Sequence, residues 1–317
     1  MIRLLNLIQN EQMKIYRRLR TWILALLLIA IVVLAGLVSH PGTDEDASDK
    51  WKVSAAETIE HNKKELENND LPDKFKQQMK EEIALQQYML DHNYPPTDNT
   101  LWGGAIRASG IIIVVTLFTV IIAGDMVAGE FTWGTIKLLL IRPASRAKIL
   151  LSKYLTTLLF AVTLLIVLFV TALIVNGFLY GFQNLGLPHL KVDAEGQVHE
   201  GSMLVFTLAT YGLKLIELVM IVTLAFMIST VFRSSSLAIG LSIFIMFAGQ
   251  IITMLLLRYS WGKYFLFANT DLTPYLKGQP PLAEGMTLGF SIVVLVVYFL
   301  LFILLSWEIF RRRDVAA

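Results

Sequence analysis

Six long apolar runs constrain the fold of this chain more than any other feature. They lie at residues 22–38, 105–124, 154–175, 203–232, 237–257 and 286–307. A helix of roughly 20 residues crosses the apolar core of a bilayer, so five of the runs have the length of one span, and residues 203–232, with about 30 residues, are long for one crossing. Because 55% of the 317 residues are hydrophobic and only 16% are charged, the chain is too apolar for a soluble domain of this size. The sequence therefore predicts an all-α integral membrane protein with six transmembrane helices.

The first 21 residues carry an amphipathic pattern. Apolar side chains recur at helical spacing and basic side chains occupy another face, although Glu11 and Gln12 interrupt the apolar stripe. This pattern predicts an interfacial helix on the cytosolic leaflet, and the alternative is a basic flank that only sets topology. A basic flank before an apolar run also begins a signal peptide, but no small-residue cleavage site follows residues 22–38, so we expect the first span to be retained.

Residues 39–104 form a long polar segment between the first two apolar runs. Between positions 41 and 100 there are 14 acidic residues and seven lysines, a net charge of −7. Two helices are expected, over about residues 54–67 and 73–92, because the stretch from Asn68 to Pro72 combines residues that end one helix and begin another. We interpret this segment as a helical extracellular insertion with a solvated surface. His61 and His92 have no companions at metal-ligand spacing.

A charged link at residues 125–153 joins the second and third apolar runs. Asp125 and Glu130 occupy its first turns, and five basic residues fill the remainder. Arg142-Pro143 interrupts any helix that runs through this link, since proline lacks an amide hydrogen and disfavours helix in the preceding residue. The pattern fits a short helix followed by a break at the membrane surface, and it also fits an ordinary loop whose basic residues follow the positive-inside rule.

The link also resembles a known family. Its pattern is Glu130, Gly134-Thr135, a leucine run, Arg142-Pro143-Ala144-Ser145-Arg146, Ile149-Leu150 and Lys153-Tyr154. It is similar to that of the permease subunits of type-2 ABC exporters. The resemblance implies a coupling helix that docks on a separate ATPase subunit, present in two copies, which binds ATP and Mg. It further implies a second permease chain, as a homodimer or heterodimer, and no cofactor on this chain.

The resemblance assigns the coupling role to a small set of residues in the link. They are Asp125, Glu130, Gly134, Thr135, Arg142, Pro143 and Arg146. Among them we expect Glu130 to be a polar or ionic anchor, Gly134 to permit close approach, and Arg142-Pro143 to turn the chain.

The fourth apolar run contains an ionisable pair, Lys214 and Glu217. The two residues are three apart and share a helical face. Charges inside a bilayer are expensive and often functional, so this is a possible intramembrane polar pair. In the alternative that we favour, residues 203–213 form an outer interfacial helix and both charges lie near the outer surface, so that Lys214→Ala would barely change export.

Charge distribution predicts the orientation of the chain. The segments placed inside the cell (1–21, 125–153, 232–236 and 308–317) have a net charge of +9, and those placed outside (39–104, 176–202 and 258–285) have a net charge of −8. Basic residues near span ends remain on the cytosolic side, so both termini are expected there, in a bacterial cytoplasmic membrane. Residues 176–202 are expected to be a polar outer loop. For residues 258–285 the resemblance implies short re-entrant helices, and the alternative is an ordinary loop.

The expected function is export rather than catalysis. The chain has no phosphate-binding loop, no zinc-protease or hydrolase motif and no cysteine, and its basic clusters are too short for nucleic acid. We expect a permease subunit that exports a hydrophobic or amphipathic substrate: a drug, an antimicrobial peptide or a lipid. One alternative is a non-pumping immunity or sensor protein that binds a peptide through its acidic outer segment. Another is a membrane enzyme that uses outer carboxylates.

Overall fold

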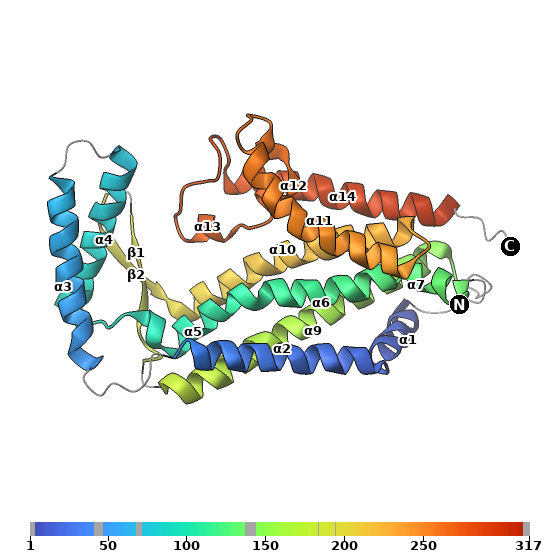
Figure 1. The fold of residues 1–317 in the computed structure, drawn as a ribbon, viewed down its shortest axis with the longest axis horizontal. Coiled ribbons are helices and arrows are strands. Elements are labelled where there is room, and N and C mark those ends of the chain that lie inside the picture. Colours follow the sequence, from blue (N-terminus) through green and yellow to red (C-terminus); the bar gives the residue numbers. More distant parts are fainter. Residues whose placement is uncertain are drawn as a thin grey trace. The chain divides into compact units, whose positions relative to one another are not determined.

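The computed structural model describes residues 4–40, 47–67, 72–136, 144–182, 184–193 and 195–312. Most of these residues are helical (Figure 1), and six helical segments are long and apolar enough to cross a membrane. They are α2 (Leu19–Val38), Leu101–Asp125, α9 (Arg146–Tyr180), α10 (Met203–Val231), α11 (Ser235–Leu256) and α14 (Leu288–Arg312). The prediction of a multi-pass, mostly helical membrane protein is confirmed.

Several helices extend beyond the apolar runs that predicted them. The second span consists of α5 (Leu101–Ala108), a 3-10 turn (Ser109–Ile111) and α6 (Ile112–Asp125). Helix α9 has 35 residues, so it begins inside the charged link. Helix α10 is continuous over 29 residues and includes the stretch that the sequence divides into an interfacial helix and a span.

The chain divides into two compact units. The first unit contains Met1–Ile31, Ser109–Val170 and Thr210–Ala317, and the second contains Val32–Ala108 and Thr171–Ala209.

In the first unit, α1 (Leu4–Tyr16) and α7 (Ala128–Thr132) join the long helices. Large side chains such as Phe160, Phe226 and Ile122 are fully buried, and many apolar side chains remain exposed, as expected where lipid covers the surface. Helices α6 and α11 pack side by side (Figure 1).

A single hydroxyl fixes the break between α6 and α7. Ser229 Oγ on α10 donates to the carbonyl oxygen of Gly124 at 2.7 Å and accepts the amide hydrogens of Val127 and Ala128 at 3.1 and 3.0 Å. Backbone groups at a helix break need such partners when they are buried. The start of the charged link is therefore held by α10.

Short helices follow α11 in the first unit. A 3-10 turn (Gly262–Tyr264), α12 (Leu266–Asn269) and α13 (Thr273–Leu276) lie between α11 and α14. Leu266, Phe267, Ala268 and Leu272 are buried, and α12 packs against both α11 and α14. Residues 258–285 thus contain short packed helices rather than an ordinary loop.

The second unit contains the two helices predicted in the polar segment. They are α3 (Ala47–Leu66) and α4 (Asp73–His92), which pack together, and a 3-10 turn (Thr97–Asn99) follows. The unit also holds an antiparallel hairpin, β1 (Pro188–Val192) and β2 (Val198–Ser202), which contacts α4.

This hairpin was not expected from the sequence, in which residues 176–202 have the pattern of a polar loop. The hairpin forms around Asp193, whose carboxylate accepts the amide hydrogens of Glu195 and Gln197, and around Gly196, with φ of +81°.

Candidate functional site

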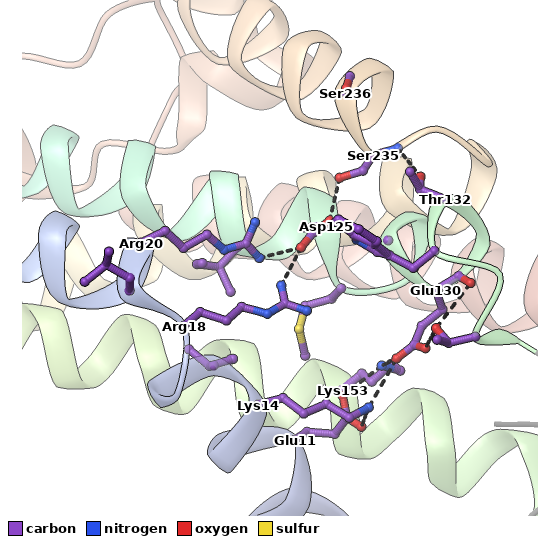
Figure 2. Close-up of a pocket in the computed structure, with 17 residues that line it drawn as sticks. Glu11, Lys14, Arg18, Arg20, Asp125, Glu130, Thr132, Lys153, Ser235 and Ser236 are labelled. Carbon is purple, nitrogen blue, oxygen red and sulfur yellow. Dashed lines mark hydrogen bonds and ion pairs between the residues drawn. The ribbon is translucent and has the colours of Figure 1, made fainter. Parts of the chain in front are cut away.

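Charged side chains gather around a cavity of about 890 Å³ in the first unit (Figure 2). They come from α1, the turn after it, α2, α6, α7 and α9, and the first residues of α11 complete the lining. The charged residues are Glu11, Lys14, Arg18, Arg20, Asp125, Glu130 and Lys153.

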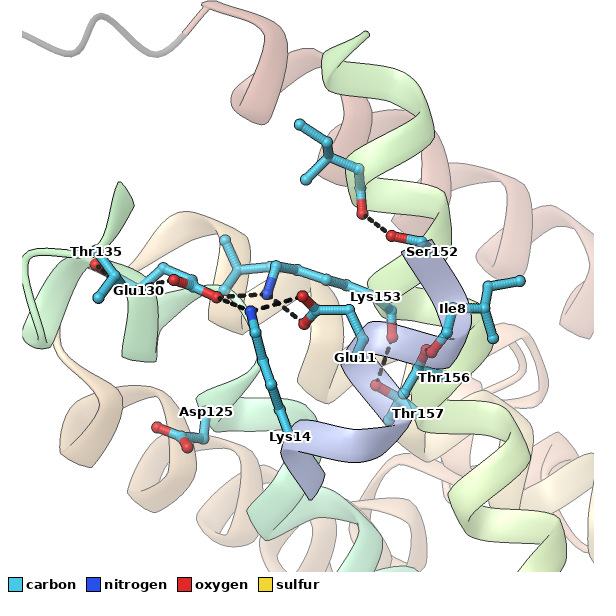
Figure 3. A network of polar contacts seen from close by, with 12 residues as sticks. Ile8, Glu11, Lys14, Asp125, Glu130, Thr135, Ser152, Lys153, Thr156 and Thr157 are labelled. Atoms are coloured by element: carbon cyan, nitrogen blue, oxygen red, sulfur yellow. Dashed lines mark hydrogen bonds and ion pairs between the residues drawn. The ribbon is translucent and has the colours of Figure 1, made fainter. Parts of the chain in front are cut away.

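Four of these charges form a closed ring, which we call the four-charge ring (Figure 3). Lys153 Nζ lies 2.7 Å from Glu130 Oε1 and 2.8 Å from Glu11 Oε2. Lys14 Nζ lies 2.6 Å from Glu11 Oε1 and 3.3 Å from Glu130 Oε1. Each carboxylate therefore contacts both ammonium groups, and the ring ties α1, α7 and α9 together.

Burial makes this pairing necessary. The Lys153 side chain is only 3% exposed, that of Glu11 is also buried, and that of Glu130 is 13% exposed. An unpaired charge at such a position would carry a large desolvation penalty. Burial alone would raise the pKa of Glu130, but Lys153, the hydroxyl of Thr135 and Lys14 outweigh it and lower this pKa to about 2. Burial also acts to raise the pKa of Glu11, but the nearby Lys153 and Lys14 outweigh it, so this pKa is lowered.

Helix α1 presents Glu11 to the ring because of its spacing. Leu7, Glu11 and Ile15 are four residues apart and are all buried, so they share the packed face of α1. Tyr16 Oη donates to Thr163 Oγ1 at 3.2 Å, which fastens the same helix to α9. The acidic residue that interrupts the apolar stripe is therefore on the buried face.

Asp125 forms a second polar centre of the cavity. Its Oδ2 accepts from Arg18 Nη1 at 2.7 Å and from Arg20 Nη2, and its Oδ1 accepts from Ser235 Oγ at 2.5 Å (Figure 2). The carboxylate is buried at the end of α6. A Cβ at Gly129 would lie 2.6 Å from Oδ1, so this glycine makes room for Asp125.

Gly134 is placed by its backbone conformation. A Cβ at this position would have no described residue within 4 Å, and the close approach expected for Gly134 stays a prediction. Its φ of +67° lies in the left-handed region, where only glycine is free of strain. Gly134 is thus needed for the turn after α7, and within the chain Gly129 is a glycine that the Asp125 carboxylate approaches closely. Trp133 beside it is 74% exposed.

The remaining residues predicted for coupling have separate positions. Thr135 Oγ1 donates to the Glu130 carboxylate, which agrees with a polar role for both residues. Arg146 Nη1 donates to the carbonyl oxygen of Arg311 at 2.7 Å, joining the start of α9 to the end of α14. Arg142 and Pro143 lie outside the described residues.

Lys214 and Glu217 do pair, and they have a third partner. Lys214 Nζ lies 2.9 Å from Glu217 Oε2 and 3.0 Å from Asp271 Oδ2. Asp271 precedes α13 and accepts from Thr273 Oγ1 at 2.7 Å. This cluster therefore joins α10 to the short helices of the first unit, and it is separate from the charged cavity. The small effect expected for Lys214→Ala stays a prediction.

Sequence reasoning missed most of the cavity. Glu11, Lys14, Arg18, Arg20 and Ser235 were not assigned to a site, and Lys153 was noted only within the resemblance. The one usable signal was Glu11, a charge on an otherwise apolar helical face. Within the described ranges, no group of three or more His, Cys, Asp or Glu side chains could hold a metal ion.

Comparison with known proteins places the chain in a family. The model of the family described as "Protein of unknown function (DUF2705)" matches residues 75–316. The chain belongs to the DUF2705 family. "Uncharacterized protein YhcI" of Bacillus subtilis (strain 168) is 41% identical over 318 residues, which covers 99% of this chain and 100% of that protein. "Uncharacterized membrane protein YdbK" of the same strain is 33% identical over 221 residues, or 69% of this chain and 85% of that protein.

The DUF2705 match includes only part of the charged cavity. Asp125, Glu130, Lys153 and Ser235 lie within residues 75–316, whereas Glu11 and the two arginines precede them. Both centres of the cavity therefore combine residues from inside and outside the matched region. The membrane assignment in the name of the second relative agrees with the six apolar helices.

Proposed function

We propose that this chain is the membrane-spanning subunit of an ATP-driven exporter of the type-2 ABC class. Residues 125–153 and helix α1 would receive force from a separate ATPase subunit. The observation that carries the proposal is the four-charge ring, which ties α1, α7 and α9 together through buried ion pairs.

A ring of this kind suits the transmission of force. Buried ion pairs hold their partners in one geometry, because separating them leaves a buried charge without a partner. Asp125 adds α2 and α11 to the same assembly through Arg20 and Ser235. A push on α7 would therefore move several helices as a body, which is how packed elements change between discrete arrangements. The exposed Trp133 offers the pushing subunit a large apolar contact.

The remaining parts of the proposal follow from resemblance and from charge. Two ATPase subunits would bind ATP and Mg, and a second permease chain, identical or related, would complete the path. Both termini would lie in the cytosol of a bacterium, and the acidic segment at residues 39–104 would lie outside the cell. The short helices between α11 and α14 would be re-entrant in the outer leaflet. The substrate would be hydrophobic or amphipathic: a drug, an antimicrobial peptide or a lipid.

Co-purification tests the proposal directly. The tagged full chain, isolated from its native membrane, should bring an ATP-hydrolysing subunit with it. Glu130→Gln should uncouple that subunit and abolish substrate-stimulated ATP hydrolysis. Glu308→Gln is the control, because Glu308 lies on α14 with its side chain 43% exposed, and it should leave the stimulation unchanged. The absence of any ATPase in the purified complex would contradict the proposal, as would unchanged stimulation in Glu130→Gln.

Orientation can be tested independently. The sequence contains no cysteine, so a single cysteine at Thr132 or Trp133, both exposed, gives a clean labelling site. We expect it to react only when the reagent reaches the cytosol. Labelling from outside intact cells would refute a cytosolic coupling region.

A second candidate function is peptide sensing or immunity without pumping. By sequence the second unit holds 17 acidic and nine basic residues. It also contains an apolar recess of about 230 Å³ between α4 and β1, lined by side chains such as Leu85, Met89 and Leu190. A basic peptide with an apolar anchor would match both features. Peptide binding to a chain that co-purifies with no ATPase would favour this function.

A further inference from the structure

We propose that the charged cavity binds the phosphate group of an anionic membrane lipid through the guanidinium groups of Arg18 and Arg20. The inference concerns binding by this chain alone, so it does not depend on the proposed export function.

The cavity has more cationic than anionic side chains. The four-charge ring is balanced, with two lysines and two glutamates. Asp125, in contrast, is the carboxylate that both Arg18 and Arg20 contact. One positive charge at this end of the cavity is therefore not neutralised by the residues that line it.

The two arginines also have spare hydrogen-bond donors. Each guanidinium carries five N–H groups in a planar fork. Arg18 and Arg20 each direct one terminal nitrogen at Asp125. The Nε atom of Arg20 is buried and has no hydrogen-bond partner among the described residues. A buried donor in this condition is costly, and it points to an acceptor from outside the chain.

The cavity leaves room for such an acceptor. The Asp125 carboxylate is buried, whereas the side chains of Arg18 and Arg20 are 45% and 38% exposed. The guanidinium groups therefore line an open space of about 890 Å³ together with Asp125, and they are more exposed in it than the carboxylate (Figure 2). Ser236 also lines this space. A phosphate has the charge and the oxygen geometry that fit a pair of guanidinium forks.

The neighbouring residues indicate that the phosphate belongs to a lipid. Leu19, between the two arginines, is 75% exposed, and Trp22 and Ile23 on the next turn are also exposed. Apolar side chains at the start of a span face hydrocarbon, and tryptophan gathers at the membrane interface. Arginines beside them lie at the depth of lipid headgroups.

Binding of defined lipids to the purified full chain tests the proposal. Native mass spectrometry with mixtures of phosphatidylglycerol and phosphatidylcholine measures the preference for the anionic lipid. We expect a clear preference in the wild type, and a roughly tenfold loss in Arg18→Gln/Arg20→Gln, because charge-assisted hydrogen bonds are removed. Arg17→Gln is the matched control, since Arg17 is exposed on the same turn but does not line the cavity. The control should keep the preference.

A second variant that should strengthen lipid binding distinguishes loss of the site from misfolding of the double variant. Asp125→Asn keeps both arginines and removes the carboxylate that occupies them, so it should strengthen the preference for phosphatidylglycerol several-fold. The proposal is overturned if the wild type shows no preference, if Arg17→Gln loses as much as the double variant, or if Asp125→Asn binds the anionic lipid no better. Displacement of the lipid by millimolar inorganic phosphate would assign the site to a soluble anion and overturn the lipid assignment.

Discussion

Lys153 Nζ lies 2.8 Å from Glu11 Oε2, a contact that joins residues 142 positions apart. Lys153 is on the first turns of α9 and Glu11 is on α1, and neither charge is open to solvent. The contact makes the N-terminal helix part of the packed interior of the first unit, rather than a loosely attached segment.

Lys153→Met should destabilise the protein severely. It removes the buried ammonium shared by the carboxylates of Glu11 and Glu130, and breaking a buried pair from one side costs about 3 to 5 kcal/mol. Thermal unfolding in detergent measures the effect. Lys148, five residues earlier on the same helix, makes no ion pair with the described residues, so Lys148→Met should change the melting temperature little. Equal melting temperatures for the two variants would contradict the ring's structural role.

The ring should also set the response to acid. Glu130 has a pKa of about 2 against an ordinary value of 4.5, so the unfolded chain binds its proton more readily than the folded chain. The stabilisation is therefore complete above pH 4.5 and is lost as the pH falls towards 2. A shift of this size corresponds to about 3 kcal/mol.

Unfolding measured between pH 7 and 3 tests this dependence. The melting temperature of the wild type should fall below pH 5, and Glu130→Gln should show a lower but flatter profile. Glu308→Gln, a change on the exposed side of α14, should keep the wild-type slope. An unchanged slope in Glu130→Gln would assign the acid sensitivity to other carboxylates.

Gly134→Ala should strain the turn that follows α7. A non-glycine residue in the left-handed region costs about 1 to 2 kcal/mol, and no described residue lies within 4 Å of a Cβ at position 134. Gly110→Ala is the comparison, because a Cβ there also meets nothing within 4 Å and its φ is not in the positive range. We expect the melting temperature to decrease in Gly134→Ala and to stay unchanged in Gly110→Ala. The reverse order would show that φ does not decide the choice of glycine at position 134.

Ser229→Ala should loosen the charged link without removing a charge. The hydroxyl serves one carbonyl and two amides at the junction of α6 and α7, so its loss leaves buried backbone groups unpaired, at about 1 to 3 kcal/mol. Ser306 is equally buried, but its hydroxyl only donates to Phe302 O within α14. Ser306→Ala should therefore be milder. Hydrogen exchange at Val127 and Ala128 should rise only in Ser229→Ala.

The fold was largely predictable from the sequence because its main signal is local. A run of about 20 apolar residues indicates a membrane helix wherever it occurs. The helices of the polar segment were also marked by their own boundary residues, from Asn68 to Pro72. The hairpin was missed because its strands are short, half-exposed and joined by a loop whose turn depends on Asp193 and Gly196.

The charged cavity was much less predictable, because its contacts are long-range. Glu11 was visible as an interruption of an apolar stripe, but its spacing cannot reveal that the partner is Lys153. In the sequence Arg18 and Arg20 look like ordinary basic residues that flank a span. Only the fold shows that both donate to the Asp125 carboxylate, as Ser235 does. In the same way Lys214 and Glu217 were paired by their spacing, whereas Asp271 could be added only from the fold.

The length of α9 bears on how a lysine can be so deeply enclosed in a membrane protein. At 1.5 Å per residue, its 35 residues extend for about 52 Å, and the hydrocarbon layer is only about 30 Å thick. Roughly 20 Å of this rod must therefore emerge from the lipid tails or be absorbed by tilting. Lys153 is only seven residues from the start of the helix, so it can lie at the depth of the headgroups and water although protein surrounds it. At that depth the burial of a charge costs less than in the hydrocarbon layer.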